Sequence, residues 1–259
     1  MKINRRITAG AAGLALAAGL GMGMAVPASA STSTSKPPTS YSTLWSGMIA
    51  QPKSGSFTKV SAIVTVPKVN CSVTPGWTSP YGADSFHWVG FGESNKTMEQ
   101  AGVVASCESP EQPNYSAQFE MYPATPTTSV VAVHPGNRVF ESVRYSGGEY
   151  WLTIRNMSTG RWQNMIVKSS DKRGNAEVIT SHWSWLQNFG AVQLADFGQV
   201  GFRSISFTDS HGTTGSLTSP AWTYKRVIML GTVTNDMISV PGVVFSHGTA
   251  FDVTWKGEH

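Results

Sequence analysis

Three polar side chains lie in segments of the chain that read as β-strands, and their types are those that do acid–base or hydrogen-bonding chemistry in a cleft. They are Glu120, Glu177 and Gln100. Successive side chains of a strand point to opposite faces, so Glu120 shares a face with Gln118 and the aromatic Tyr122, which suits a cleft wall. Taken alone, each such residue is more often a solvated group on an outer sheet face, so the alternation by itself assigns no role.

Several common catalytic signatures are absent from the sequence, which narrows the chemistry. The chain has no Gly-x-Ser-x-Gly elbow, no His-Glu-x-x-His, no Cys-x-x-Cys, no Gly-x-Gly-x-x-Gly and no EF-hand loop. No two of the six histidines lie two or four positions apart. A metal site would need ligands from distant strands. We therefore expect neither a metal nor a cofactor.

The first thirty residues have the pattern of a secretory signal peptide. Lys2, Arg5 and Arg6 precede an Ala/Gly-rich run over 8–26, and a small-x-small cleavage motif ends at Ala30. These thirty residues hold three of the 19 basic residues and none of the 15 acidic ones, so the formal charge of +4 falls to about +1 once they are removed. We expect a secreted, extracellular protein that has no membrane association after cleavage. Nucleic acid is not an expected partner, because binding phosphates requires clustered cations.

The remainder reads as a flexible polar leader over 31–40 followed by one all-β domain over 41–259. Only 13% of the residues are charged, while Gly reaches 26 and Pro 14, which favours many short strands joined by turns. Eleven strand-like segments are predicted: 57–66, 85–91, 98–105, 115–122, 138–145, 149–155, 162–168, 177–183, 199–207, 226–231 and 250–255. Their spacing is typical of an antiparallel sandwich or barrel with few helices, and we expect a monomer.

The two cysteines, Cys71 and Cys107, are predicted to form a disulfide, because exported proteins meet oxidising conditions. Such a bond would stabilise the fold by about 3–4 kcal/mol in the loop-entropy model. A catalytic thiol is disfavoured, since it would have to stay reduced outside the cell.

Five short motifs, read in order, resemble those of the glutamic peptidases, also called eqolisins, and most closely their secreted bacterial homologues. They are FHWVG at 86–90, EQAG at 99–102, AQFEMYP at 117–123, AEVI at 176–179 and LADFG at 194–198. The resemblance runs from Trp45 to Trp255 and includes Cys71 and Cys107, which match the disulfide of the bacterial members. It implies a concanavalin A-like sandwich of two antiparallel β-sheets, with the active site on the concave face.

The resemblance also implies roles for individual residues. Glu177 and Gln100 fall on the catalytic dyad of the family, in which the glutamate takes a proton from the attacking water and the glutamine NH₂ donates to the oxyanion. Glu120 matches a further active-site carboxylate, Trp88 a cleft aromatic, and Gln118 a position in the substrate cleft. The implied function is an acid-active endopeptidase that acts on polypeptides without a metal or cofactor.

The chain departs from the family pattern around the dyad. Gln118 stands in place of a cleft aromatic, Val178 in place of a tryptophan, and Ser181 in place of a second carboxylate. Gly92 occupies the position of an aspartate, unless Glu93 replaces it from the next position.

These departures keep two alternatives open. The first is a catalytically silent sandwich of the same family that binds peptide or glycan in the altered cleft. The second is a β-sandwich glycanase acting through Glu120 and Glu177, although no Glu-x-Asp-x-Glu pattern occurs in the sequence.

Overall fold

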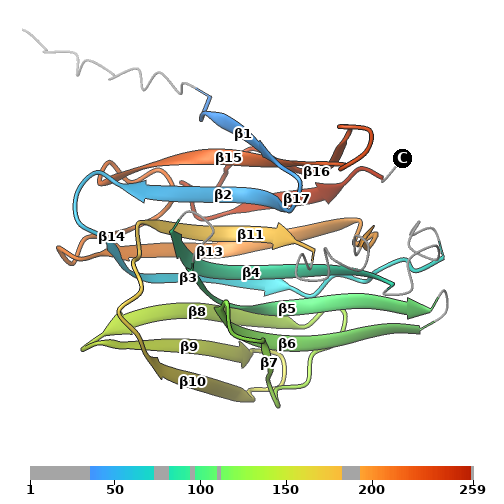
Figure 1. Ribbon diagram of the computed structural model, residues 1–259, viewed down its shortest axis with the longest axis horizontal. Coiled ribbons are helices and arrows are strands. Elements are labelled where there is room, and N and C mark those ends of the chain that lie inside the picture. Colours follow the sequence, from blue (N-terminus) through green and yellow to red (C-terminus); the bar gives the residue numbers. More distant parts are fainter. Residues whose placement is uncertain (1–35, 73–81, 94–96, 110–111, 183–192, 258–259) are drawn as a thin grey trace, which may run out of the picture. The chain divides into compact units, whose positions relative to one another are not determined.

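The backbone folds into β-strands arranged in two layers (Figure 1). A computed structural model describes residues 36–72, 82–93, 97–109, 112–182 and 193–257. Residues 37–259 form one unit. No helix long and apolar enough to cross a membrane occurs within the ranges just given. The expected signal peptide lies outside the described residues.

The first layer is a mainly antiparallel sheet that contains the predicted site. Hydrogen-bonded neighbours follow in the order β15 (Trp222–Leu230), β2 (Trp45–Pro52), β11 (Asn175–Ser181), β4 (Ala83–Glu93), β5 (Thr97–Ser109), β6 (Gln112–Tyr122) and β7 (Thr127–Thr128). Two short strands pair in parallel, β1 (Thr39–Ser42) with β15 and β12 (Gln193–Leu194) with β4. Thr39 and Ser40, assigned to the leader from the sequence, are therefore paired in β1.

The second layer is antiparallel and contains no residue of the predicted dyad. Its order is β17 (Phe251–Trp255), β13 (Gln199–Asp209), β3 (Phe57–Thr65), β8 (Arg138–Ser146), β9 (Glu149–Asn156) and β10 (Trp162–Lys168), with β14 (Thr214–Gly215) beside β13. Strand β16 (Met237–Pro241) pairs with both β15 and β17, so it joins the two layers along one edge.

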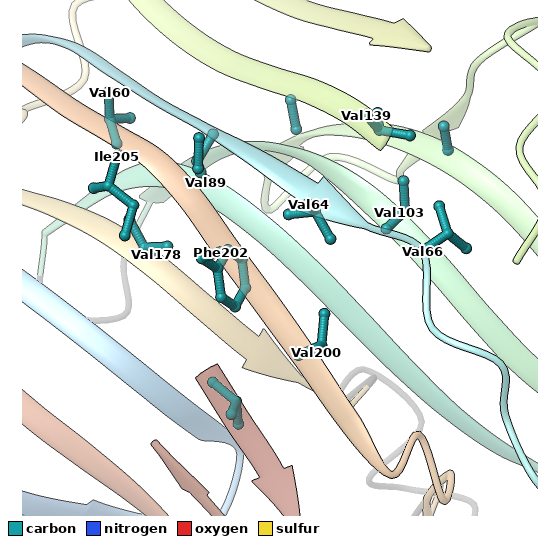
Figure 2. Close-up of a cluster of buried hydrophobic side chains, with 14 of the residues drawn as sticks. Val60, Val64, Val66, Val89, Val103, Val139, Val178, Val200, Phe202 and Ile205 are labelled. Atoms are coloured by element: carbon teal, nitrogen blue, oxygen red, sulfur yellow. The ribbon is translucent and has the colours of Figure 1, made fainter. Parts of the chain in front are cut away.

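The hydrophobic core lies between the layers. Alternating residues of strands from both sheets point inward, among them Val64 of β3, Val139 of β8, Val103 of β5 and Val178 of β11 (Figure 2). Each of these side chains is at most 1% exposed. Burial of one face of each sheet is the largest stabilising contribution to such a sandwich. The predicted all-β, concanavalin A-like sandwich of two antiparallel sheets is confirmed.

The disulfide is also confirmed. Cys71 and Cys107 are joined by an S–S bond of 2.03 Å, with their Cα atoms 5.5 Å apart. The bond connects the segment after β3, a strand of the second layer, to the C-terminal part of β5, a strand of the first. It therefore links the two layers covalently.

Candidate active site

The face of the first sheet that points away from the core carries its own side-chain cluster. Six apolar side chains gather there, with Trp45 packed against them: Ile49, Phe86, Trp88, Val104, Ile179 and Val227. The predicted dyad alternates onto this same face, because Glu177 lies two residues before Ile179 and Gln100 lies four residues before Val104.

Strand register places the site residues in one row across the sheet. Glu177 on β11 pairs with Gly90 on β4, Gly90 pairs with Gln100 on β5, and Gln100 pairs with Glu120 on β6. Adjacent strands are about 4.8 Å apart, so the backbones of Glu177 and Gln100 are separated by roughly 10 Å with only a glycine between them. The row therefore brings together three residues that lie far apart in the sequence.

Three glycines keep this part of the face free of side chains. A Cβ at Gly90 would lie 2.5 Å from the backbone oxygen of Glu99 and 3.1 Å from Cβ of Gln100. At Gly92 it would lie 2.8 Å from Oε1 of Glu177, and at Gly102 it would lie 2.6 Å from Cβ of Trp88. The Glu177 carboxyl group thus leans over Gly92, the position where the family pattern has an aspartate.

A hydrogen bond fixes the Gln100 amide, whereas the side-chain oxygen of Gln100 and one oxygen of Glu177 have no partner in the part of the chain that the structure describes. Nε2 of Gln100 donates a short hydrogen bond to the carboxylate of Glu120. Oε1 of Gln100 and Oε2 of Glu177 are buried and have no hydrogen-bond partner among the described residues. The free oxygen of Glu177 can accept a hydrogen bond from a water, and the second N–H of the Gln100 NH₂ group can donate to a carbonyl oxygen.

Burial sets the charge state of both carboxyl groups. Glu177 is 2% exposed, and burial raises its pKa to about 7, although the positive charge of Lys225 acts in the opposite direction. Burial likewise raises the pKa of Glu120 to about 7, against the hydrogen bond from Gln100. Both groups therefore change charge near neutral pH, where ordinary glutamates are fully ionised.

The other predicted cleft residues lie in the next rows of the same face. Trp88 pairs with Gly102, which pairs with Gln118. The indole nitrogen of Trp88 donates to Oγ of Ser181 at 3.0 Å. Ser181, which stands in place of a family carboxylate, thus fixes the buried indole.

The side chain of Val178 does not lie on the dyad face. Its side chain is fully buried in the core between the sheets, so the missing tryptophan at this position does not alter the dyad face (Figure 2). The expectation that position 178 contributes to an altered cleft is therefore wrong. The side chain of Glu93, the suggested substitute for the missing aspartate, lies outside the described residues.

Lys225 is a site residue that the sequence does not reveal. It pairs with Ile49 on β2, and Ile49 pairs with Glu177, so Lys225 belongs to the same row as the dyad. Nothing in the local sequence of β15 indicates this neighbour, because the row depends on the pairing of strands more than 120 residues apart. Within the described ranges, no group of three or more His, Cys, Asp or Glu side chains could hold a metal ion.

Solved structures of glutamic peptidases have the same fold. Scytalido-glutamic peptidase with a peptide-based transition state analogue has a TM-score of 0.66 and 21% identity, over 83% of this chain and 98% of that one. SCP-B, a member of the eqolisin family in complex with the tripeptide Ala-Ile-His, has a TM-score of 0.65 and 21% identity over the same shares. Aspergilloglutamic peptidase from Aspergillus niger has a TM-score of 0.56 and 22% identity, over 67% of this chain and 99% of that one.

The family assignment rests on the sequence as well as on the fold. No curated protein matches the chain. Residues 43–242, which span all the site residues described above, match the Peptidase A4 family. The chain therefore belongs to the Peptidase A4 family, the glutamic peptidases.

Proposed function

We propose that the protein is a secreted endopeptidase that hydrolyses peptide bonds through Glu177 and Gln100. The observation that carries this proposal is the register, which sets the two side chains opposite each other across Gly90 on one sheet face. Membership of a peptidase family and fold relatives bound to peptide-like molecules support it.

In the proposed reaction, the Glu177 carboxylate takes a proton from a water molecule as the water oxygen bonds to the scissile carbonyl carbon. The carbonyl oxygen becomes an oxyanion and accepts a hydrogen bond from the Gln100 NH₂ group. Glu177 then returns the proton to the amide nitrogen, the C–N bond breaks, and an acid and an amine leave. Glu120 is a positioning residue, because an oxygen of its carboxyl group accepts a hydrogen bond from Gln100 and so orients the amide.

The raised pKa of Glu177 supports activity that declines as the solution becomes more acid. The base form falls about tenfold for each pH unit below 7, because one proton occupies the carboxylate. Above about pH 7 the other buried acids of the fold ionise, which destabilises the folded protein. We expect activity in the range between about pH 5 and 7, less acid than a dyad with an ordinary glutamate would allow.

The decisive experiment is digestion of a denatured protein at several pH values, with Glu177→Gln and Gln100→Ala beside the unaltered chain. Loss of the general base is expected to lower kcat/KM by at least about 10²-fold, and loss of the oxyanion donor by about 10²–10³-fold. Cleavage should persist with pepstatin, metal chelators and serine- or cysteine-directed reagents. Full activity in either variant would remove the dyad from consideration.

The same assay separates the alternatives. A silent peptide- or glycan-binding protein would bind the denatured substrate without producing new N-termini. A glycanase would release reducing sugar from polysaccharides, but Gln100 lies between Glu120 and Glu177 and is hydrogen-bonded to Glu120. The register thus favours the peptidase over a carboxylate pair.

A further inference from the structure

The outer face of the second sheet combines positive charge with exposed aromatic surface. Its side chains alternate with core positions along β3, β8, β9 and β10, all of which are described over their full length. These outward side chains include one carboxylate, Glu149, and five cations: Lys59, Arg138, Arg144, Arg155 and Lys168. We call this surface the basic face. The charge of about +1 expected after removal of the first thirty residues gives no sign of this face.

A groove of about 620 Å³ lies on the basic face. It is lined mainly by Phe140, Thr153, Arg155, Met157, Trp162 and Asn164. The register sets Phe140, Arg155 and Trp162 in one row and Thr153 and Asn164 in the next. Apolar, cationic and neutral polar groups therefore meet in one concave site on rigid strands, as is typical of ligand sites.

Two tryptophans of this face differ in availability. The guanidinium of Arg144 lies 5.1 Å from the ring centroid of Trp151, so one ring is covered by a cation. Trp162 is 62% exposed in the groove. Oδ1 of Asn164, beside it, has no hydrogen-bond partner within the described part of the chain. Of the two rings, that of Trp162 is therefore the one accessible to a ligand in the groove.

We propose that the groove binds an acidic polysaccharide, with a sugar ring over Trp162 and a uronate carboxylate on Arg155. The flat indole complements the apolar C–H face of a pyranose ring, and a guanidinium pairs with a carboxylate through two parallel hydrogen bonds. Thr153 and Asn164 supply neutral groups for the sugar hydroxyls. The other cations of the basic face extend the attraction along a charged polymer.

Other anionic polymers use only part of this surface. An acidic peptide would pair with the arginines but present no flat ring to Trp162. Single-stranded nucleic acid is bound by successive exposed aromatic rings along a basic track, whereas here Arg144 covers Trp151. The combination of one open ring, one hydroxyl, one amide and clustered cations fits a uronic acid chain best.

The test is calorimetric titration of the full chain with polygalacturonate. Fully methyl-esterified pectin, poly-glutamate and oligo(dT) serve as comparison polymers that separate ring stacking from charge. The dissociation constant for polygalacturonate is expected to rise at least about tenfold in Trp162→Ala and in Arg155→Gln, and to rise with salt. Matched controls are Tyr41→Ala and Lys256→Gln, which alter an exposed aromatic and an exposed cation on other elements and should leave binding unchanged.

Peptide hydrolysis provides the independent control, because the groove and the dyad lie on different sheets. Trp162→Ala and Arg155→Gln should keep the activity of the unaltered chain, which also shows that they fold. The proposal is overturned if polygalacturonate does not bind, if poly-glutamate or oligo(dT) binds equally well, or if both groove variants bind it as the unaltered chain does. These outcomes are independent of whether the dyad cleaves peptides.

Discussion

At the scale of single residues, the site depends as much on absent side chains as on present ones. Gly92 leaves the space that the Glu177 carboxyl group occupies, and Gly90 leaves space beside Gln100. Lys225, in the same row, is the cation that acts against the burial of that carboxyl group. Position and charge state of the proposed base can therefore be altered separately.

Gly92→Ala is expected to displace the Glu177 carboxyl group. A Cβ would lie 2.8 Å from Oε1, at the end of a flexible side chain, so the carboxyl group moves and the backbone does not. A shift of this size costs roughly 10²-fold in kcat, because the base no longer reaches its water. Steady-state kinetics and a thermal unfolding curve check this, with the melting temperature expected to change little.

Gly174→Ala is the matched control, because a Cβ there would have nothing within 4 Å. Equal activity of the two alanine variants would contradict the assignment of Glu177.

Lys225→Gln is expected to move the acid limb of the pH–rate profile to higher pH. The lysine charge favours the Glu177 carboxylate and lowers its pKa, so a neutral side chain lets the pKa rise above about 7. The profile of kcat/KM reports groups of the free enzyme and is the measurement to make. Lys256→Gln, an exposed change elsewhere, should leave the limb in place. A limb that moves to lower pH would exclude Lys225 from this role.

At the scale of elements, sequence patterns locate strands well and pairing partners poorly. All eleven predicted segments coincide with observed strands. Strand β2 was missed because Met48 packs into the core while Ile49 packs into the opposite cluster, so the strand is buried on both faces and shows no alternation. Strand β16 was missed because it is short and ends at Pro241.

The dyad could be located only through the family motifs. Alternation correctly predicts that Glu177 and Ile179 share one face. It does not predict that β11 inserts between β2 and β4. Such pairing is set by packing between distant segments rather than by local propensity. The same limit explains why the row partner Lys225 was missed. Position 178 is different, because alternation from Glu177 already puts Val178 on the opposite, core-facing side of β11.

Removing the disulfide is expected to weaken the fold without altering the site. The double variant Cys71→Ser/Cys107→Ser frees a loop that the bond closes over a sequence separation of 36. Its unfolding free energy should fall by about 3–4 kcal/mol in the loop-entropy model. Urea titration measures this, and peptide hydrolysis well below the melting temperature should persist. An unchanged midpoint would mean that the bond does not constrain the unfolded chain.

At the scale of the whole molecule, an unusual set of buried acids links folding to pH. Glu99, Glu120, Glu141 and Glu177 are at most 6% exposed. Burial raises the pKa of Glu99 to about 8, helped by the nearby Asp171, and raises that of Glu141 well above its ordinary value. The folded protein therefore holds protons that the unfolded chain releases above pH 4.5.

The stability of the fold is expected to be greatest in mildly acid solution. The contribution of these acids is fully present below about pH 4.5 and is lost as pH rises through 7 and 8. Burial lowers the pKa of His87 to about 3, so its contribution is present above pH 6.5 and is lost as pH falls towards 3. Melting temperatures across pH 3–9 should show a maximum between about pH 4 and 6.

Glu99→Gln tests the cause of the alkaline decline, because an amide keeps the shape of the protonated acid and cannot ionise. The variant should lose less stability between pH 6 and 9 than the unaltered chain. A decline of the same steepness would assign the effect to other groups.

Because the site residues lie in one row across several strands, catalytic activity requires that these strands pair in the correct register. A slip of β11 by one residue against β4 would turn Glu177 into the core and bring Ala176 and Val178 to the cleft. The slipped chain would still be rich in strands, yet inert. In refolded or heterologously produced material, the concentration of active molecules should therefore be measured by active-site titration. The total protein concentration would include molecules with a misaligned β11.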